Sequence, residues 1–220
     1  EPTQVAGFNQ FYDDVDETAT WQYGLAIDQK FHTTLYGGVE ATKRDLEVLY
    51  EDISPSAPPT AEEVDWEERL VRAYLYWTPH PWFALTGEYQ YEELERGRDF
   101  NANTAEHVET HRVPLGINFY HPCGLSANLA GTYTYQKGKF VPQGFPQGAP
   151  GIPGEDRFWL VDAALSYRLP KRYGMLAIVG RNLFDKSFKF MDTDPTGRNL
   201  PPSPAIQPER LVVFKYTFSF

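Results

Sequence analysis

The sequence is poor in the features that mark several common protein classes. It has a single cysteine, Cys123, which excludes a scaffold held by disulfides, and only two methionines. Its apolar runs are short, as at residues 176–179 and 211–214, whereas a membrane-spanning helix needs roughly 18 or more apolar residues in a row. Its formal net charge is -10, and a chain this acidic repels phosphate backbones, so nucleic acid is not expected as a partner.

Aromatic residues are what the sequence has in excess. There are 14 tyrosines, 15 phenylalanines and 5 tryptophans, although the mean hydropathy is only -0.49. This much aromatic surface argues against a disordered chain. Aromatic side chains favour β-sheets, and their abundance beside low hydropathy is typical of a sheet that meets a membrane interface.

Apolar and polar residues alternate along many segments of the chain, which is the pattern of a strand with two unlike faces. The spacing of apolar residues typical of a helix is rare. Trp21, Tyr23, Leu25 and Ile27, for example, alternate with small or polar residues. The pattern predicts nine strands, at residues 20–28, 33–42, 69–77, 82–92, 111–120, 125–136, 158–168, 175–182 and 210–220. Most are longer than the globular average of about 5–6 residues and long enough to cross a bilayer when tilted.

The connections between these strands alternate between short and long. Short ones lie at Gln29-Lys30, 78–81, 121–124 and 170–174, and long ones at 43–68, 93–110, 137–157 and 185–209. This alternation is typical of an antiparallel up-and-down transmembrane β-barrel with short periplasmic turns and long external loops. A Greek-key sandwich gives no reason for it, so a soluble sandwich or lipocalin-like carrier is the lesser alternative.

We therefore expect an all-β barrel over residues 20–220, preceded at 1–19 by an external loop or the remnant of a preceding strand. Nine strands is an odd number, whereas bacterial single-chain barrels have an even one. The first residues also lack the basic region and apolar stretch of a signal peptide. Both observations predict the C-terminal part of a larger barrel, completed by upstream strands of the same precursor.

Two short motifs lie between the last two predicted strands, one at the end of the penultimate strand and one at the start of the last strand. Asn182, Leu183, Phe184 and Asp185 follow one strand, and Pro208-Glu209-Arg210 precedes the strand that ends in Phe220. This arrangement resembles the C-terminal barrel end of TonB-dependent receptors. There, an Asn-Leu-Phe-Asp-like motif ends the penultimate strand and a Pro-Gly-Arg-like motif precedes a last strand that ends in Phe. Glu209 stands where that second motif has glycine.

The resemblance implies a barrel of the Gram-negative bacterial outer membrane, surrounded by its lipids, that takes up a bulky solute. It also implies a role for the alternating residues of the last strand as the signal read by the barrel-assembly machinery. These residues are Val212, Phe214, Tyr216, Phe218 and Phe220.

The sequence shows neither a plug domain nor a TonB box, so the implied contact with TonB depends on an N-terminal region that is not seen here. Some barrels that share the C-terminal pattern have no plug. The alternative function is therefore a plug-less scaffold or secretion barrel attached to periplasmic repeats or partner subunits.

Five ionisable residues on the polar side of their strands are candidates for the barrel lumen, as a water-filled conduit or as structural ion pairs. They are Arg72, Glu88, Arg112, Asp162 and Lys215.

No motif of catalysis or cofactor binding accompanies these residues. His107 and His111 lie where a loop runs into a strand, and His121 with Cys123 has no second pair to complete a zinc site. A Gly-x-Ser-x-Gly elbow and a phosphate-binding glycine loop are both absent from the sequence. We therefore expect no enzyme activity, no metal and no cofactor.

Overall fold

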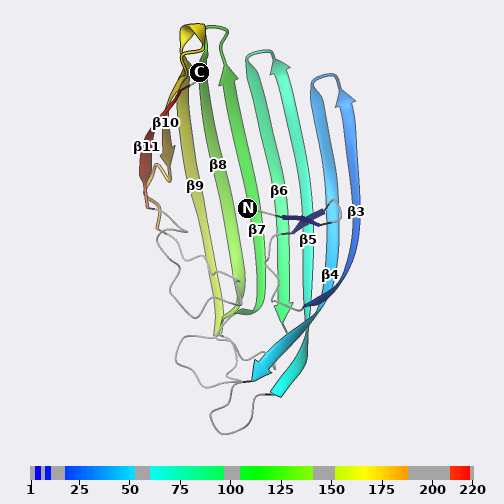
Figure 1. The fold of residues 1–220 in the computed structure, drawn as a ribbon. Helices are drawn as coiled ribbons and strands as arrows, with labels where there is room; N and C mark the ends of the chain where they lie inside the picture. The colour runs from blue at the N-terminus through cyan, green and yellow to red at the C-terminus, as the bar shows by residue number, and fades with distance from the viewer. Residues whose placement is uncertain are drawn as a thin grey trace.

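The structure, a computed structural model, describes residues 3–5, 8–10, 18–52, 60–96, 105–140, 152–187 and 209–218. Nine strands form one antiparallel sheet in which each pairs with its neighbours in sequence (Figure 1). They are β3 (Ala19–His32), β4 (Leu35–Asp52), β5 (Thr60–His80), β6 (Phe83–Arg96), β7 (Ala105–Tyr120), β8 (Leu125–Phe140), β9 (Ile152–Arg168), β10 (Met175–Arg181) and β11 (Leu211–Thr217). This confirms the predicted nine-stranded up-and-down order. None of the helices in the described ranges has the length and apolar character needed to cross a membrane.

The sheet is open within the described residues. Strands β3 and β11 form its two edges, at opposite sides of the sheet in Figure 1, so closure into a barrel stays a prediction. Residues 1–19, expected as a loop or strand remnant, contain β1 (Thr3–Val5) and β2 (Phe8–Gln10), which form a separate two-stranded sheet. Ala19 already belongs to β3.

Several strands extend further than the sequence pattern predicted, so the long loops are shorter than expected. Lys43 and Glu68 are the proposed ends of one loop, but Lys43 lies in β4 opposite Arg69, and Glu68 lies in β5 opposite Arg44. Glu93 and Lys137 also lie within strands. The prediction ended each strand where apolar alternation stops. Backbone pairing continues beyond that point. Some charged residues there face partners of opposite sign, as Arg44 faces Glu68, and others face like charges, as Lys43 faces Arg69.

The short connections lie at one end of the sheet, here called the turn end; the opposite end is called the loop end. The turns at 121–124 and 170–174 are where the sequence predicted them. Gln29 and Lys30, predicted as a turn, instead belong to β3, and the turn is formed by Thr33 and Thr34. A backbone hydrogen bond holds this turn against β5: the carbonyl of Thr34 accepts the N–H of Thr78 at 2.8 Å.

The register places most of the large exposed apolar residues of the nine strands on one face of the sheet, here called the apolar face. Paired residues of neighbouring strands point to the same side. One row across β4–β11 contains Leu35, Trp77, Leu85, Ile117, Leu129, Ala163, Gly180 and Val212. The next row toward the turn end contains Phe83, Phe119, Ala127, Leu165, Ile178 and Phe214. The apolar sets predicted strand by strand therefore join into one surface.

The opposite face, here called the polar face, holds most of the buried side chains. A small hydrophobic cluster of Leu46, Val48 and Trp66 lies near the loop end of β4 and β5. Most other buried positions on this face are polar: Glu40, Thr42, Arg44, Glu68, Glu92, Thr110, Thr134 and Gln136. Large apolar side chains such as Leu25, Leu115 and Phe214 are exposed on the other face. This distribution is the reverse of that in a water-soluble sheet, which buries its apolar face.

Candidate functional site

The polar face carries a network of ion pairs and hydrogen bonds that includes three of the predicted lumen residues. Arg72 donates from Nε and Nη2 to both carboxylate oxygens of Glu88, each at 3.1 Å. The hydroxyl of Tyr76 donates to the same carboxylate at 2.5 Å, and Arg112 donates to Glu92 at 2.8 Å. A carboxylate held by two guanidinium N–H groups is fixed in orientation as well as in charge.

Neutral side chains continue this network across β7, β8 and β9. The amide of Asn128 donates to Asn118 at 2.8 Å, and the hydroxyls of Ser126 and Ser166 lie 2.8 Å apart. Each of these bonds joins adjacent strands, and the four side chains are half-buried. The polar face thus presents hydrogen-bonding groups over its whole width, and not in one cluster.

The other two lumen candidates lie elsewhere on the polar face. Asp162 accepts the backbone N–H of Asn182 at 2.8 Å, so it caps the end of β10. Lys215 is paired with Ala177 and is exposed. Of the five lumen candidates, the structure therefore joins only Arg72 and Glu88 directly. Arg112 bonds Glu92 instead, and Asp162 and Lys215 belong to neither ion pair.

The motif residues after β10 form a turn that joins three strands. The side chain of Asn182 is buried and bonds the backbone of Lys186 twice, accepting its N–H at 2.9 Å and donating to its carbonyl at 3.0 Å. Leu183 donates its N–H to Val161 of β9 at 2.9 Å. Asp185 accepts the N–H of Arg210, just before β11, at 2.9 Å. The motif known only by resemblance thus has a structural role in this chain.

Replacing Asn182 by alanine should lower the free energy of unfolding by about 2 kcal/mol, because two hydrogen bonds of a buried side chain are lost. Asn182 and Asp185 also have φ values of 46° and 52°, a region that asparagine and aspartate tolerate better than alanine does. Chemical denaturation of the two proteins measures the difference. Phe184→Ala is the matched control, since that ring is 77% exposed. Equal losses from both variants would contradict the role given to Asn182.

The last strand presents its predicted signal residues on the apolar face. Val212, Phe214 and Tyr216 are paired with Gly180, Ile178 and Leu176 of β10. Phe218 follows the strand, with its ring 4.1 Å from that of Tyr216. Phe220 lies outside the described residues. Recognition of this strand by an assembly machinery stays a prediction.

A row of charged residues borders the apolar face on its loop side and was not anticipated from the sequence. Here called the charged row, it contains Lys43, Arg69, Glu93, Glu109, Lys137 and Glu155, which are successive partners across β4–β9. Salt bridges and the contacts of the His107 ring link most of its members through Glu67 and His107, from Lys43–Glu67 at 2.9 Å to Lys137–Glu109 at 2.9 Å. Its members are far apart in sequence, so only the register brings them together.

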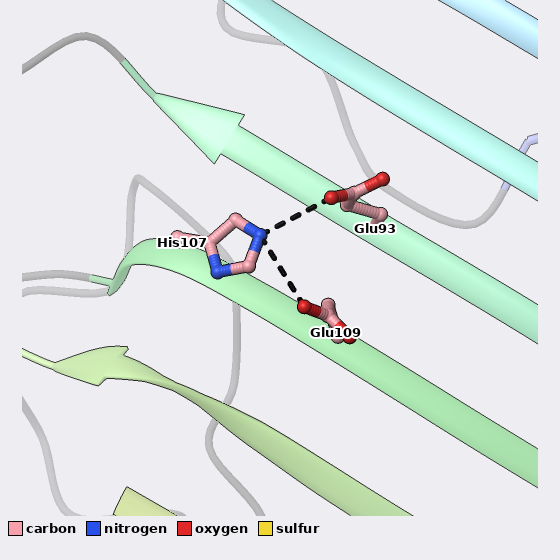
Figure 2. Close-up of side chains that lie close together, drawn as sticks. All are labelled: Glu93, His107 and Glu109. Carbon is pink, nitrogen blue, oxygen red and sulfur yellow. Dashed lines mark hydrogen bonds and ion pairs between the residues drawn. The ribbon is translucent and has the colours of Figure 1, made fainter. Parts of the chain in front are cut away.

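Glu93, His107 and Glu109 lie at the centre of the charged row and could each offer a ligand atom to a metal (Figure 2). His107 Nε2 is 3.2 Å from Glu93 and 3.8 Å from Glu109. Both carboxylates also bind cations of the protein, Glu93 with Arg69 at 3.1 Å and Glu109 with Lys137 at 2.9 Å. A metal would have to compete with those two cations, so an ion-pair network is the simpler account of the cluster.

The lysines of the charged row lie beyond the apolar rows, and their carboxylate partners stabilise the charged ammonium. Hydrogen bonds that Lys43 donates to Glu67 and Asp45 raise its pKa above the ordinary value, and the bond that Lys137 donates to Glu109 does the same for Lys137. Both lysines are therefore fully charged at neutral pH.

Aromatic side chains flank the apolar rows at both ends. Beside the charged row, His111 contacts Tyr91 and Tyr135 with ring centroids 5.0 and 5.9 Å away. At the turn end, Trp82 lies 4.9 Å from His121. Other exposed rings at the turn end are those of Trp77, Tyr120, Tyr167 and Tyr173. Aromatic rings thus border the apolar rows at both the loop end and the turn end.

Together, the described residues define an all-β protein built on one up-and-down antiparallel sheet with unlike faces. Comparison with known protein families, with curated proteins and with solved structures finds no match.

Proposed function

We propose that this chain forms part of the wall of a β-barrel in the Gram-negative outer membrane, and that the barrel takes up a bulky solute. The observation that carries the proposal is the inverted distribution of side chains: a continuous apolar face is exposed while much of the buried face is polar. Lipid on the apolar face accounts for this inversion, because outer-membrane barrels are apolar outside and polar inside.

The height of the apolar face supports the proposal. Along β6 the apolar residues run from Phe83 to Tyr91 and are followed by Glu93 of the charged row. Eight steps of about 3.3 Å give about 26 Å of strand. At the tilt of roughly 40° usual in outer-membrane barrels this is about 20 Å of height, comparable with their apolar band of about 25 Å. Aromatic rings at both borders suit the headgroup level, where amphipathic rings are favoured.

The polar face supports a conduit in preference to a solid wall. The half-buried pair of Arg72 with Glu88 keeps hydrogen-bonding groups at mid-strand, and the amides of Asn118 and Asn128 add others nearer the turn end. Polar groups at membrane depth are tolerated where they meet water or one another. Uptake, as opposed to export or scaffolding, rests on the resemblance of residues 158–220 to TonB-dependent receptors.

Uptake is tested in cells that carry the full polypeptide or a deletion of it, grown in medium with a mixture of solutes too large for general pores. We expect one class of solute to be depleted only when the polypeptide and TonB are both present. Arg72→Ala combined with Glu88→Ala should change the rate of depletion while the protein stays in the outer-membrane fraction. Equal depletion with and without the polypeptide would favour the scaffold or secretion alternative.

A further inference from the structure

The charged row is unevenly exposed: its three cations and Glu155 reach solvent, whereas Glu93 and Glu109 are more covered. The side chains of Lys43, Arg69 and Lys137 are 43%, 50% and 45% exposed. Three of the carboxylates that bind them are more covered: Glu67 is 28% exposed, Glu93 15% and Glu109 20%. Asp45, which also binds Lys43, is 45% exposed. The border of the apolar face therefore presents three exposed cations, with the exposed carboxylates of Asp45 and Glu155 beside them.

Position and charge together point to a lipid headgroup as the partner of this row. On the turn side, the next row contains Tyr91, His111 and Tyr135, and apolar residues follow it. A lipid whose tails pack on those apolar rows would have its headgroup at the level of the charged row. Anionic headgroups attract lysine and arginine at this level, whereas a soluble anion would gain nothing from the neighbouring apolar face.

We propose that Lys43, Arg69 and Lys137 form a binding site on the apolar face for phosphate-bearing lipid headgroups. Lys43 and Arg69 are cross-strand partners, so their backbones are about 5 Å apart and their cations can share one phosphate. Lys137 lies three strands from Arg69, about 14 Å away, and serves a neighbouring headgroup. The carboxylates beneath hold the cations in place and keep them charged. The proposal rests on the membrane location proposed above.

The test uses the full polypeptide extracted in a neutral detergent, with bound lipids identified by native mass spectrometry. The probes are dilauroyl phosphatidic acid, which carries a phosphate monoester, and dilauroyl phosphatidylcholine, which has no net charge. We expect the native protein to retain phosphatidic acid preferentially. The variant K43Q/R69Q/K137Q should lose about 30-fold of that preference, because each of the three cations near an anionic headgroup contributes about threefold.

Two matched variants separate charge at this site from charge in general. K43R/R69K/K137R keeps the three positive groups and should keep the preference. K30Q/R168Q/K171Q removes the same charge at the turn end and should leave the preference unchanged. If the triple glutamine variant does not fold, the single variant K137Q removes one cation and should lower the preference by about threefold.

Three outcomes would overturn the proposal: an unchanged preference in the glutamine variants, an equal loss in the turn-end variant, or displacement of the lipid by excess inorganic phosphate. The last outcome would indicate a site for a free anion. The membrane proposal is checked separately in the same preparations. A native protein that washes out of membranes with carbonate would contradict membrane insertion, whereas one that stays but shows no lipid preference would contradict only the headgroup site.

Discussion

Replacing Leu115 or Leu129 by arginine should lower the free energy of unfolding by about 2–4 kcal/mol when the protein is measured in a bilayer. Both side chains lie mid-strand on the apolar face and are 48% and 49% exposed. At a site this exposed to water, the same change would alter stability by less than about 0.5 kcal/mol. The size of the loss therefore reports whether lipid covers the apolar face. Urea unfolding in lipid vesicles measures it.

The matched control is arginine at Asn118 or Asn128, on the polar face of the same two strands. Asn128 donates a hydrogen bond to Asn118 at 2.8 Å, so each control should cost only the loss of this bond, about 1 kcal/mol. Arginine at either position would lie on the polar face, so its charge would not be buried in lipid. Similar penalties on both faces, or a negligible penalty at Leu115 and Leu129, would contradict the assignment of the apolar face to the membrane.

The two faces of the sheet could be predicted from the sequence because side-chain direction depends only on period-two alternation. Val71, Ala73, Leu75 and Trp77 share a face in any extended strand, whatever their neighbours are. The structure adds that each of these sets meets the corresponding set of the next strand, as Trp77 meets Leu85. The order of strands also follows from the sequence, since short connections favour antiparallel neighbours.

The ends of the strands and the charged row could not be predicted, because both depend on which residues lie opposite one another. Arg69 and Glu93 are 24 residues apart and form a pair only in the observed register. From the sequence, the segment from Lys43 to Glu68 is a charged loop as plausibly as a pair of strands. Gln29 and Lys30 illustrate the same limit, since β3 continues through them to a bulge before His32.

The motif around Asn182 was located by resemblance, without a physical reason for its residues. The structure supplies one, because Asn182 and Asp185 hold backbone groups that a strand end would otherwise leave unpaired. Arg210 is 25 residues from Asp185, so no local pattern could have joined them. The lumen candidates show the opposite case: the polar side of each strand was predicted correctly, but the partners of Arg72 and Asp162 were not.

The second large effect concerns the two open edges of the sheet. Strands β3 and β11 are the first and the last of nine alternating strands, so they run in the same direction. If β3 and β11 met each other, they would pair in parallel. Strand β11 of one copy and β3 of a second copy in the same membrane orientation would also pair in parallel. Antiparallel closure needs an odd number of further strands. Without them, each unpaired N–H and C=O at an edge in lipid costs several kcal/mol.

Residues 1–220 expressed alone should therefore fail to give a compact, heat-resistant band on unboiled gels. A longer polypeptide that supplies the further strands should give such a band, and boiling should abolish it. Deuterium exchange in the longer protein should also protect every backbone amide of Ala19–His32, including those that point away from β4, because the added strand would bond them. A stable, heat-resistant monomer made from residues 1–220 alone would contradict this expectation. The further strand would then have to come from these residues themselves, as from residues 5–12, or β3 would have to pair in parallel with β11.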